Sequence, residues 1–376
     1  MKILIRQFLS QLHSWSCVGW GLADAFLKQG HQVDLFATDG DGKEHLPTHL
    51  KPHLIGHTEL NKPQVFGRLP KPEYDCQISY TAMKNFPAYL SSGSKNRLGI
   101  WVYEWSGKNV LPTGFAKHYK SCDMLCVPSQ FGKQVFMDSG VPEDRMAVIP
   151  HGIIREQYAQ NTTMPLPTDK KFKLLVNLAK THLRKNIPGL LEAYGRAFNN
   201  QDDVCLIIKG RDKPIISPFD VSLSACLRDF KSKFPQHAEI KVMSEFLDDV
   251  SVLYRSVDCL YSLSNCEGFL FPALESIASG KMVVAPNWGG QIDFLDDSNS
   301  LLVSGKEDRA NPKSIYWEGK PNAVWFKPDV EHAASCLRQV SDNHRKLNSI
   351  VEVHRPKILQ DYDWTQIASK FLRLCQ

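Results

Sequence analysis

The sequence lacks several patterns that would assign it to a common class of protein. Its ten cysteines include no C-x-x-C pair, which argues against a zinc ribbon and a thioredoxin-type site. Several lie in apolar runs, as Cys205 and Cys259 do, so we expect reduced, buried thiols in a cytoplasmic protein. No stretch approaches about 18 uncharged apolar residues, so we expect no membrane-spanning helix. The N-terminal apolar run is broken by Arg6, which favours a strand over a signal peptide.

The chain also has no large excess of charge of either sign. Lys and Arg number 45 against 40 Asp and Glu, a formal net charge of +5 in 376 residues. This excess is too small to predict nucleic-acid binding, although it suits an anionic small ligand or peripheral contact with an anionic membrane face. The chain has no P-loop, H-E-x-x-H or G-x-S-x-G motif. Glycine separates Asp39 from Asp41, as is common in turns, so we expect no metal site there.

Apolar runs alternate with helical segments along the whole chain. Strands are predicted at residues 1–8, 31–38, 97–104, 123–129, 146–152, 172–179, 204–210, 239–246, 257–264 and 281–287. Helices are predicted at residues 19–29, 131–139, 188–199 and 272–279, and in the amphipathic tail that begins at Asp363. This alternation predicts an α/β fold in which helices cover both faces of parallel sheets.

A polar stretch at residues 155–171 interrupts the alternation and contains two prolines, which indicates a linker. We therefore predict two Rossmann-like, doubly wound domains with a cleft between them. The first comprises residues 1–155 with a C-terminal crossover helix at about 360–376, and the second comprises residues 170–355. Residues 304–325 are expected to form a long irregular insertion. Ligands of such sheets bind at the carboxyl ends of the strands.

Two glutamates flank a predicted helix start in the second domain. Pro272 suits the first helical position, which places Glu267 in the preceding loop and Glu275 in the first turn. The N–H groups of residues 268–271 and the positive end of the helix favour an anion. Two carboxylates that accept hydroxyl groups around a phosphate would suit a nucleotide-sugar. The spacing alone leaves open that Glu275 only caps the helix and that Glu267 is solvated.

This segment, with Gly268, Phe269 and Pro272 between the glutamates, resembles the Glu-x7-Glu signature of family 4 retaining glycosyltransferases, which have the GT-B fold. Further similarities to that family lie in the K-Q-G-H-Q-V of residues 28–33, the V-I-P-H-G-I of residues 148–153, Gly289-Gly290, and Trp364. Asp293 stands where the family usually has glutamate. These matches span both predicted domains.

The resemblance implies a role for each part of the donor site. Glu275 would bind the ribose and Glu267 the transferred sugar. The backbone amides of Phe269 and Leu270 would hold sugar and phosphate, and the uracil would lie near Phe246 and Leu247. The remaining donor-binding residues of this segment are Gly268 and Phe271.

Cations follow the predicted strand at residues 172–179. A cluster of them at a strand end would neutralise a diphosphate. The family commonly has G-R, four residues, then K; here Ala179-Lys180 stands in the G-R position and Lys185 in the lysine position. Lysine in place of arginine keeps the charge but loses the bidentate fork. We therefore predict Lys180, Lys185 and Glu267 as catalytic residues, against the alternative of a solvated basic turn that includes Arg184.

Acceptor residues are predicted at the carboxyl edge of the first sheet, where aromatic rings stack on sugars and a carboxylate accepts hydroxyl groups. The candidates are Ser14, Trp15, Tyr103 and Glu104. The G-G pair that the family usually has in the first loop is absent, with His13 and Ser14 in its place. An aromatic edge of the core is the alternative interpretation of Trp15 and Tyr103.

The resemblance as a whole implies a metal-independent, retaining hexosyltransferase of polysaccharide biosynthesis that uses no cofactor. Its partners would be a nucleotide-diphosphate sugar, with UDP-glucose as the leading donor and GDP-mannose still open, and a saccharide or lipid-linked acceptor. We expect it in the cytoplasm, at the inner face of the membrane if it contacts one. A sugar-nucleotide epimerase or phosphorylase of similar fold and a non-catalytic nucleotide-sugar-binding protein remain alternatives.

Overall fold

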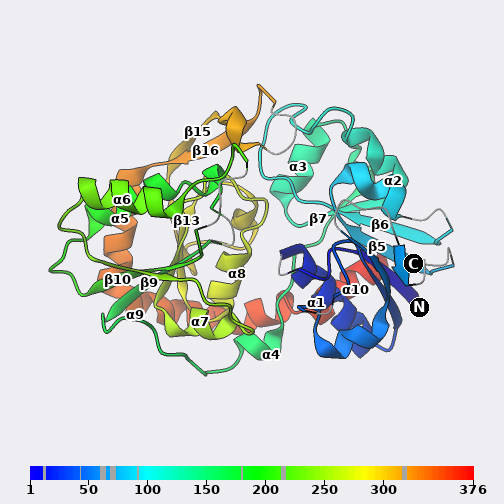
Figure 1. Ribbon diagram of the computed structural model, residues 1–376, viewed down its shortest axis with the longest axis horizontal. Coiled ribbons are helices and arrows are strands. Elements are labelled where there is room, and N and C mark those ends of the chain that lie inside the picture. The colour runs from blue at the N-terminus through cyan, green and yellow to red at the C-terminus, as the bar shows by residue number, and fades with distance from the viewer. Residues whose placement is uncertain are drawn as a thin grey trace. The chain divides into compact units, whose positions relative to one another are not determined.

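The computed structural model of the protein divides into two compact units (Figure 1). The first unit comprises Met1–Tyr103, Leu111–Arg155 and Gln360–Gln376, and the second comprises Glu104–Val110 and Glu156–Leu359. The structure describes residues 1–11, 14–42, 44–59, 65–67, 73–90, 93–178, 181–212, 217–315 and 320–376. Each unit is therefore assembled from segments that are distant in the sequence.

The first unit is built on an eight-stranded sheet in the order β4-β3-β2-β1-β5-β6-β7-β8. Its strands are parallel except for β4, which is antiparallel to β3. They are β1 (Lys2–Gln7), β2 (Gln32–Ala37), β3 (Leu54–Thr58), β4 (Val65–Gly67), β5 (Cys76–Tyr80), β6 (Asn96–Ile100), β7 (Met124–Val127) and β8 (Met146–Val148). The strand order reverses between β1 and β5, so their carboxyl ends form the switch point of this sheet.

The helices of the first unit include one from the far end of the sequence. They are α1 (Ser14–Lys28), α2 (Phe86–Tyr89), α3 (Gln130–Asp138) and α10 (Trp364–Arg373). Helix α10 packs against α1, and a Cβ atom on Gly21 of α1 would lie only 2.3 Å from Cε2 of Trp364. Asp363 caps α10 because its Oδ1 accepts the N–H of Thr365.

The second unit contains a six-stranded parallel sheet in the order β11-β10-β9-β12-β13-β14. Its strands are β9 (Phe172–Asn177), β10 (Val204–Lys209), β11 (Glu239–Met243), β12 (Cys259–Tyr261), β13 (Met282–Pro286) and β14 (Ser300–Val303). This is the strand order of a Rossmann fold, and it reverses between β9 and β12.

Helices surround this second sheet (Figure 1). They are α5 (Ile187–Ala197), α6 (Leu223–Lys233), α7 (Ser251–Ser256), α8 (Phe271–Ala278) and the long α9 (Val330–Asp361), with α4 (Arg155–Tyr158) at the entry to the unit. Short 3₁₀ helices occupy Thr48–His53, Met83–Asn85, Ala116–Ser121, Glu143–Arg145, Leu183–Lys185, Gly290–Asp293 and Pro312–Ser314.

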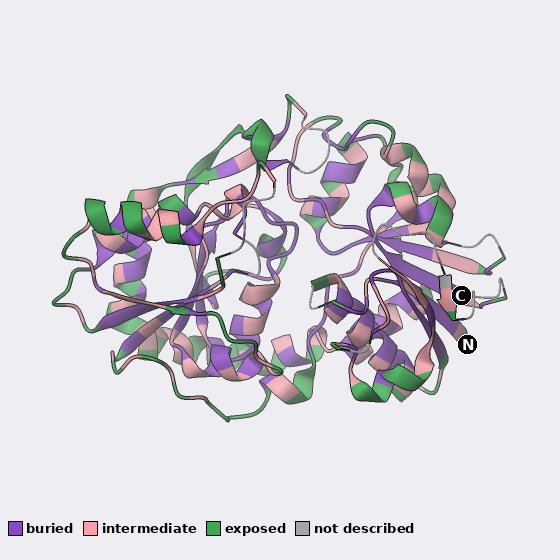
Figure 2. Ribbon diagram, in the orientation of Figure 1, coloured by how far each residue is buried: buried purple, intermediate pink, exposed green. Residues whose placement is uncertain are grey.

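The strands of both sheets form the core of their units, as Figure 2 shows by their predominantly buried residues. In β10, for example, Cys205, Leu206, Ile207 and Ile208 are all fully buried. Strands covered by helices on both faces are expected to be continuous apolar runs, and this is why β9 and β10 were predicted from sequence. Strand β5 is equally buried but was not predicted, because Gln77 and Ser79 interrupt its apolar pattern.

The segment predicted as an irregular insertion instead contains a β-hairpin, so that prediction is wrong. Strands β15 (Gly305–Arg309) and β16 (Val324–Pro328) pair antiparallel, with Gly305 opposite Pro328 and Arg309 opposite Val324. All five residues of β15 are exposed, and the four that follow Gly305 are charged, so no apolar alternation marks the strand. The hairpin forms through the backbone pairing of β15 with β16, which no local sequence pattern indicates.

No helix in the described part of the chain combines the length and apolar character needed to cross a bilayer.

Candidate active site

The candidate site lies where the order of strands reverses in the second sheet. Strand β12 pairs with β9, with Cys259 opposite Leu174 and Leu260 opposite Leu175. The loops that follow these two strands leave the same edge of the sheet, because parallel strands end at the same edge. One loop carries Lys185 and the other carries Glu267, so the topology brings them together.

Glu267 is buried, at 6% exposure, and it forms two ion pairs. Its Oε1 lies 2.5 Å from Nζ of Lys185, and its Oε2 lies 2.7 Å from Nη1 of Arg184. Burial alone would raise the pKa of Glu267, but the charges of Arg184 and Lys185 outweigh it and hold the pKa at about 2. The carboxylate is therefore ionised throughout the physiological pH range.

Arg184 also faces a second carboxylate in the same unit. Its Nη2 lies 3.5 Å from Oε1 of Glu104. Burial raises the pKa of Glu104 more than Arg184 lowers it, and burial likewise lowers the pKa of Lys185 against the pull of Glu267. The cluster thus holds two cations and two carboxyl groups in a desolvated environment.

The turn that carries the cations is fixed by hydrogen bonds. His182 caps it, since its Nδ1 accepts the N–H of Arg184 at 3.0 Å. Burial lowers the pKa of His182 to about 3, so the imidazole is neutral and its Nδ1 can accept. The N–H of Asn265 donates to the carbonyl of Arg184 at 2.7 Å, and Nδ2 of Asn186 donates to the carbonyl of Leu263. These bonds join the two site loops.

The Gly289-Gly290 pair supports the backbone of Glu267. The N–H of Gly290 donates to the carbonyl of Glu267 at 2.9 Å. Gly289 has a φ of +95°, and a Cβ atom there would lie 2.7 Å from the same carbonyl oxygen. Only glycine accommodates both the conformation and the contact.

Glu275 lies on α8 in a different environment, because no cation is among the groups that set its pKa. Its Oε1 accepts the phenol of Tyr158 at 2.8 Å, and its Oε2 accepts the phenol of Tyr254 at 2.7 Å. Burial raises the pKa of Glu275 to about 7, although the two phenols act in the opposite direction. The two glutamates of the predicted signature therefore lie in contrasting surroundings.

A small cavity opens beside this cluster. Its lining includes Asn177, Lys185, Ser262, Leu270 and Pro272, all at or beyond the carboxyl ends of β9 and β12. Leu270 precedes α8 with a φ of +60°, a left-handed conformation that is strained for leucine. The cavity adjoins the start of α8, where the sequence predicted a phosphate.

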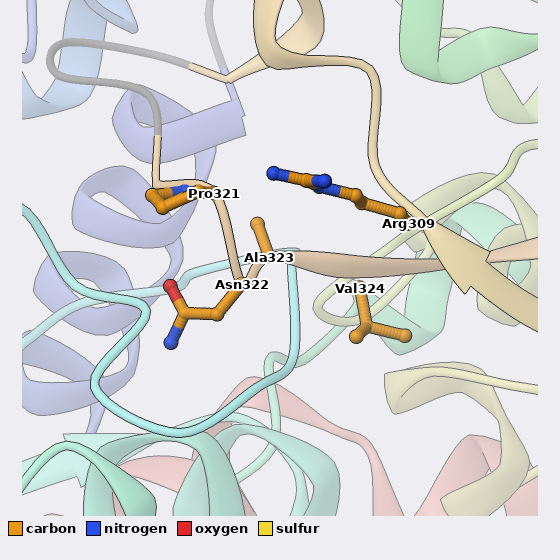
Figure 3. Close-up of a pocket in the computed structure, with 5 residues that line it drawn as sticks. All are labelled: Arg309, Pro321, Asn322, Ala323 and Val324. Atoms are coloured by element: carbon orange, nitrogen blue, oxygen red, sulfur yellow. The ribbon is translucent and has the colours of Figure 1, made fainter.

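A second hollow, drawn in Figure 3, lies at the β15–β16 hairpin. It is lined by Arg309, Pro321, Asn322, Ala323 and Val324. These residues include no carboxylate to bind sugar hydroxyls, so the hollow lacks the groups that a nucleotide-sugar would need.

The predicted base-binding residues follow β11, two strands from β9. Phe246 is exposed, at 56%, while Leu247 is partly buried. Nζ of Lys209 donates to the carbonyl of Glu245 at 2.5 Å and so anchors this loop. Lys180, predicted as a catalytic residue, lies outside the described residues.

The predicted acceptor residues have different surroundings. Ser14 is exposed at the start of α1, and Trp15 stacks on Tyr80 with ring centroids 4.9 Å apart. The structure places Tyr103 in the core, at 1% exposure, where its ring packs edge-on against Trp101. Glu104 belongs to the second unit and faces Arg184, as described above.

Several residues of the site were missed by the sequence analysis. Tyr158 lies in the segment predicted as a linker, Asn177 lies in a strand treated only as structural, and Tyr254 lies in α7, which was not predicted. Arg184 was considered only as part of a basic turn. A lone tyrosine carries no local signal of the carboxylate it contacts, so only the three-dimensional structure reveals these partners.

Comparison with protein families finds a match in the second unit. Residues 161–323 match the model of the family described as glycosyl transferases group 1. An uncharacterized glycosyltransferase of Methanocaldococcus jannaschii is 22% identical over 336 aligned positions, which cover 79% of this chain and 82% of that protein.

Solved structures with the same fold include HepE of Anabaena in complex with UDP and glucose, with a TM-score of 0.70 and 17% identity over 99% of this chain and 98% of that one. Sucrose-phosphate synthase of Thermosynechococcus elongatus has a TM-score of 0.69 and 15% identity over 100% and 98% of the two chains. The predicted α/β fold with two Rossmann-like domains of the GT-B type is confirmed. The matches also support a glycosyltransferase of the group 1 type.

Proposed function

We propose that this protein is a retaining, metal-independent hexosyltransferase of the family 4 type. It would move a glucosyl group from UDP-glucose to a hydroxyl of a saccharide or lipid-linked acceptor in polysaccharide biosynthesis. The observation that carries the proposal is the convergence of Glu267, Lys185 and Arg184 at the β9–β12 switch point, with Glu275 on the adjoining helix.

The donor is proposed from both chemistry and likeness. Carboxylates accept sugar and ribose hydroxyls, and cations with helix-terminal amides bind a diphosphate. HepE, which shares this fold, has been crystallised with UDP and glucose and with UDP-glucose. UDP-glucose is therefore the first donor to test.

Each residue then has a proposed role. Glu267 binds the hydroxyls of the transferred hexose, and Glu275 binds the ribose. Lys185, together with Lys180 and Arg184, faces the diphosphate. When the glycosidic carbon–oxygen bond breaks, its electron pair leaves with the nucleotide diphosphate, and these cations stabilise the negative charge that develops. A well-aimed donor of this kind contributes about 3 kcal/mol to the barrier reduction.

The acceptor hydroxyl attacks on the same face of the sugar that the diphosphate leaves, and its proton passes to the departing phosphate oxygen. Retention of the anomeric configuration is proposed from the family resemblance, which implies no protein nucleophile. The aromatic pair Trp15–Tyr80, at the switch point of the first sheet, is the surface proposed to stack on the acceptor.

The proposal is tested with purified protein and a panel of UDP, GDP, ADP and their sugars in a thermal-shift assay. A ligand at a hundredfold over its Kd should add about 2.7 kcal/mol of stability. Product analysis then follows transfer to oligosaccharide acceptors with and without EDTA, and NMR of the anomeric proton reports retention.

Variants connect the activity to the site. Lys185→Ala and Glu275→Ala should abolish transfer while circular dichroism stays unchanged. The control is Lys171→Ala, which removes an exposed lysine that pairs with Asp203. Near-normal turnover in both site variants would refute the assignment. Conversion of UDP-N-acetylglucosamine without an acceptor would indicate an epimerase instead, and donor binding without any turnover would indicate a non-catalytic protein.

A further inference from the structure

The hydrogen bonds around Glu275 come from two different elements. Tyr158 reaches it from α4 and Tyr254 from α7, and each phenol donates to a different oxygen of the carboxylate. A carboxylate has about four acceptor positions, so one position on each oxygen remains after these two bonds. The phenols thus set both the plane of the carboxylate and the positions that it has left.

Both tyrosines are themselves held in place. Tyr254 is fully buried, and its oxygen accepts Nδ2 of Asn177, the last residue of β9, at 2.8 Å. Tyr158 is anchored through its backbone, because Nη2 of Arg355 on α9 donates to its carbonyl at 2.5 Å. Arg255 donates to the neighbouring carbonyl of Gln157 at 2.5 Å. Side chains locked in this way are suited to orient a binding group.

The charge state of Glu275 depends on the same two bonds. Burial raises its pKa to about 7, Tyr254 and Tyr158 lower it, and Asp249 raises it. Helix α8 packs against α7, which carries Arg255, and Nε of Arg355 on α9 donates to the carbonyl of Ala278 in α8. It also packs against β12 and β13, whose only titratable side chains are those of Cys259 and Tyr261. Without the phenols, a larger fraction of Glu275 would be protonated at neutral pH and would accept hydroxyl groups less well.

We propose that Tyr158 and Tyr254 are positioning residues that hold the Glu275 carboxylate so that its remaining acceptor positions receive the vicinal hydroxyls of the donor's ribose. The inference rests on the proposed function, because it assigns Glu275 to the ribose. It goes beyond it by naming the two residues that give the carboxylate its orientation and charge.

The test is calorimetric titration of UDP, and of 2′-deoxy-UDP, into the wild-type protein and the variants Tyr254→Phe and Tyr158→Phe between pH 6 and 9. Tyr194→Phe is the matched control, since Tyr194 is an equally buried tyrosine of this unit whose phenol donates to the carbonyl of Glu239. Loss of either phenol removes a hydrogen bond that lowers the pKa of Glu275, so a smaller fraction of the carboxyl groups is ionised at pH 7.

We therefore expect each site variant to bind UDP more weakly at pH 7 and to approach wild-type affinity at pH 9. In turnover assays KM for the donor should rise while kcat changes little. The preference for UDP over 2′-deoxy-UDP, about tenfold or more for a hydrogen bond to a charged group, should fall in both variants. Tyr194→Phe should keep the affinity, the pH profile and the preference.

The outcomes separate the two proposals. If wild-type protein binds none of UDP, GDP and ADP, the proposed function itself fails. If the wild type binds UDP but Tyr254→Phe and Tyr158→Phe match it in affinity, pH profile and preference, the tyrosines have only a structural role and the inference is overturned. Circular dichroism of each single variant checks that it is folded.

A separate observation concerns two cysteines of the first unit. Cys76 begins β5 and is buried, and Cys375 follows α10 and is partly exposed. Their Sγ atoms lie 3.0 Å apart. Nδ2 of Asn96, in the strand next to β5, donates to the carbonyl of Cys375 at 3.3 Å and holds the end of the chain against the sheet. The two thiols are therefore in contact although 299 positions separate them.

We infer that Cys76 and Cys375 form a dithiol that oxidises to an intramolecular disulfide. With oxidised glutathione as the oxidant, the Cys375 thiolate attacks one sulfur and releases one glutathione. The Cys76 thiolate then attacks Sγ of Cys375 and releases the second. The protein loses two electrons and two protons, and oxidised glutathione gains them to become two molecules of glutathione. The Sγ atoms need to approach by only about 1 Å to reach the length of a disulfide bond.

The experiment treats the intact protein with oxidised glutathione and identifies cross-linked peptides by mass spectrometry. We expect Cys76 joined to Cys375, a thiol count that falls from ten to eight, and a rise in Tm that dithiothreitol reverses. Cys375→Ser should lose the rise in Tm, and Cys226→Ser, which removes another partly exposed thiol, should keep it. A glutathione adduct that stays on Cys375 while Cys76 remains a thiol would overturn the inference.

Discussion

Glu267 and Glu275 lie eight positions apart, and their surroundings move their pKa values in opposite directions. Arg184 and Lys185 hold the pKa of Glu267 at about 2 against the effect of burial, and burial raises the pKa of Glu275 to about 7 against two phenol donors. Two carboxyl groups that differ in this way suit different tasks. They also give the stability of the protein two opposite dependences on pH.

The first prediction concerns Glu267 in acid. A carboxyl whose pKa is lower in the folded state stabilises the protein above its unfolded pKa, and this stabilisation is lost as the pH falls through the folded value. For Glu267 the loss should run from pH 4.5 down to about 2. Glu267→Gln leaves Arg184 and Lys185 without their shared carboxylate and should cost about 3 kcal/mol at pH 7.

Urea unfolding of both proteins at several pH values measures this difference. Because the wild type loses the contribution of Glu267 in acid, the gap between the two proteins should narrow as the pH falls below 4.5. A gap of constant size from pH 7 to pH 3 would contradict the assigned ion pairs.

The second prediction concerns Glu275 and has the opposite sign. A carboxyl whose pKa is higher in the folded state destabilises the protein as the pH rises from its unfolded value, here 4.5, to about 7, and the cost then stays constant. Glu275→Gln should therefore be more stable than the wild type above pH 7, by about 1–2 kcal/mol after the loss of one phenol bond. The same variant should lose donor binding.

Thermal unfolding at pH 4.5 and pH 8 checks this prediction. At pH 4.5 the two proteins should have similar Tm values, and at pH 8 the variant should unfold at the higher temperature. A variant that is less stable than the wild type at pH 8 would show that the ionised carboxylate of Glu275 does not destabilise the folded protein.

The third prediction concerns Gly289, where conformation and contact can be separated. Gly289→Ala introduces a Cβ atom 2.7 Å from the carbonyl oxygen of Glu267, in addition to a φ of +95°. Gly140→Ala is the matched control, with a φ of +89° and no atom within 4 Å of the new Cβ. The control should cost about 1–2 kcal/mol for its conformation alone. Gly289→Ala should cost more and should also lower transfer activity, as measured by chemical unfolding and a turnover assay.

The fourth prediction compares two replacements of Leu270. Its φ of +60° disfavours any residue with a Cβ atom, so Leu270→Gly should be more stable than Leu270→Ala by about 1 kcal/mol. Differential scanning calorimetry of the two variants measures this difference in stability. If alanine is the more stable replacement, Leu270 is not in the left-handed conformation.

Local patterns were sufficient to predict most of the fold. The apolar runs gave β9, β10 and β13 within one or two residues, and Pro272 placed the start of α8. The 32-residue α9 was not predicted, because Pro356 interrupts its pattern and a proline inside a helix is normally read as its end. Strand β15 was missed because its exposed polar residues carry no alternation.

The candidate site was predictable only in part, and for a physical reason. Glu267, Glu275 and Lys185 lie in loops and helix starts whose sequences carry a signature. Their partners Tyr158, Tyr254 and Glu104 come from other segments, and only the folded chain brings them into contact. The burial of Tyr103 is likewise a property of packing, since the sequence shows only an aromatic residue near a strand end.

Helix α10 packs against α1 within the first unit, and the indole of Trp364 lies against Gly21 and Gly152. On the ribosome, α1 emerges more than three hundred residues before the helix that covers it. Because the first unit contains α10, it can be completed only after the whole second unit has been synthesised. Until then, the surface of α1 that α10 covers in the folded protein stays exposed. Nascent chains halted before residue 364 should be captured by chaperones or cleaved by proteases at that surface.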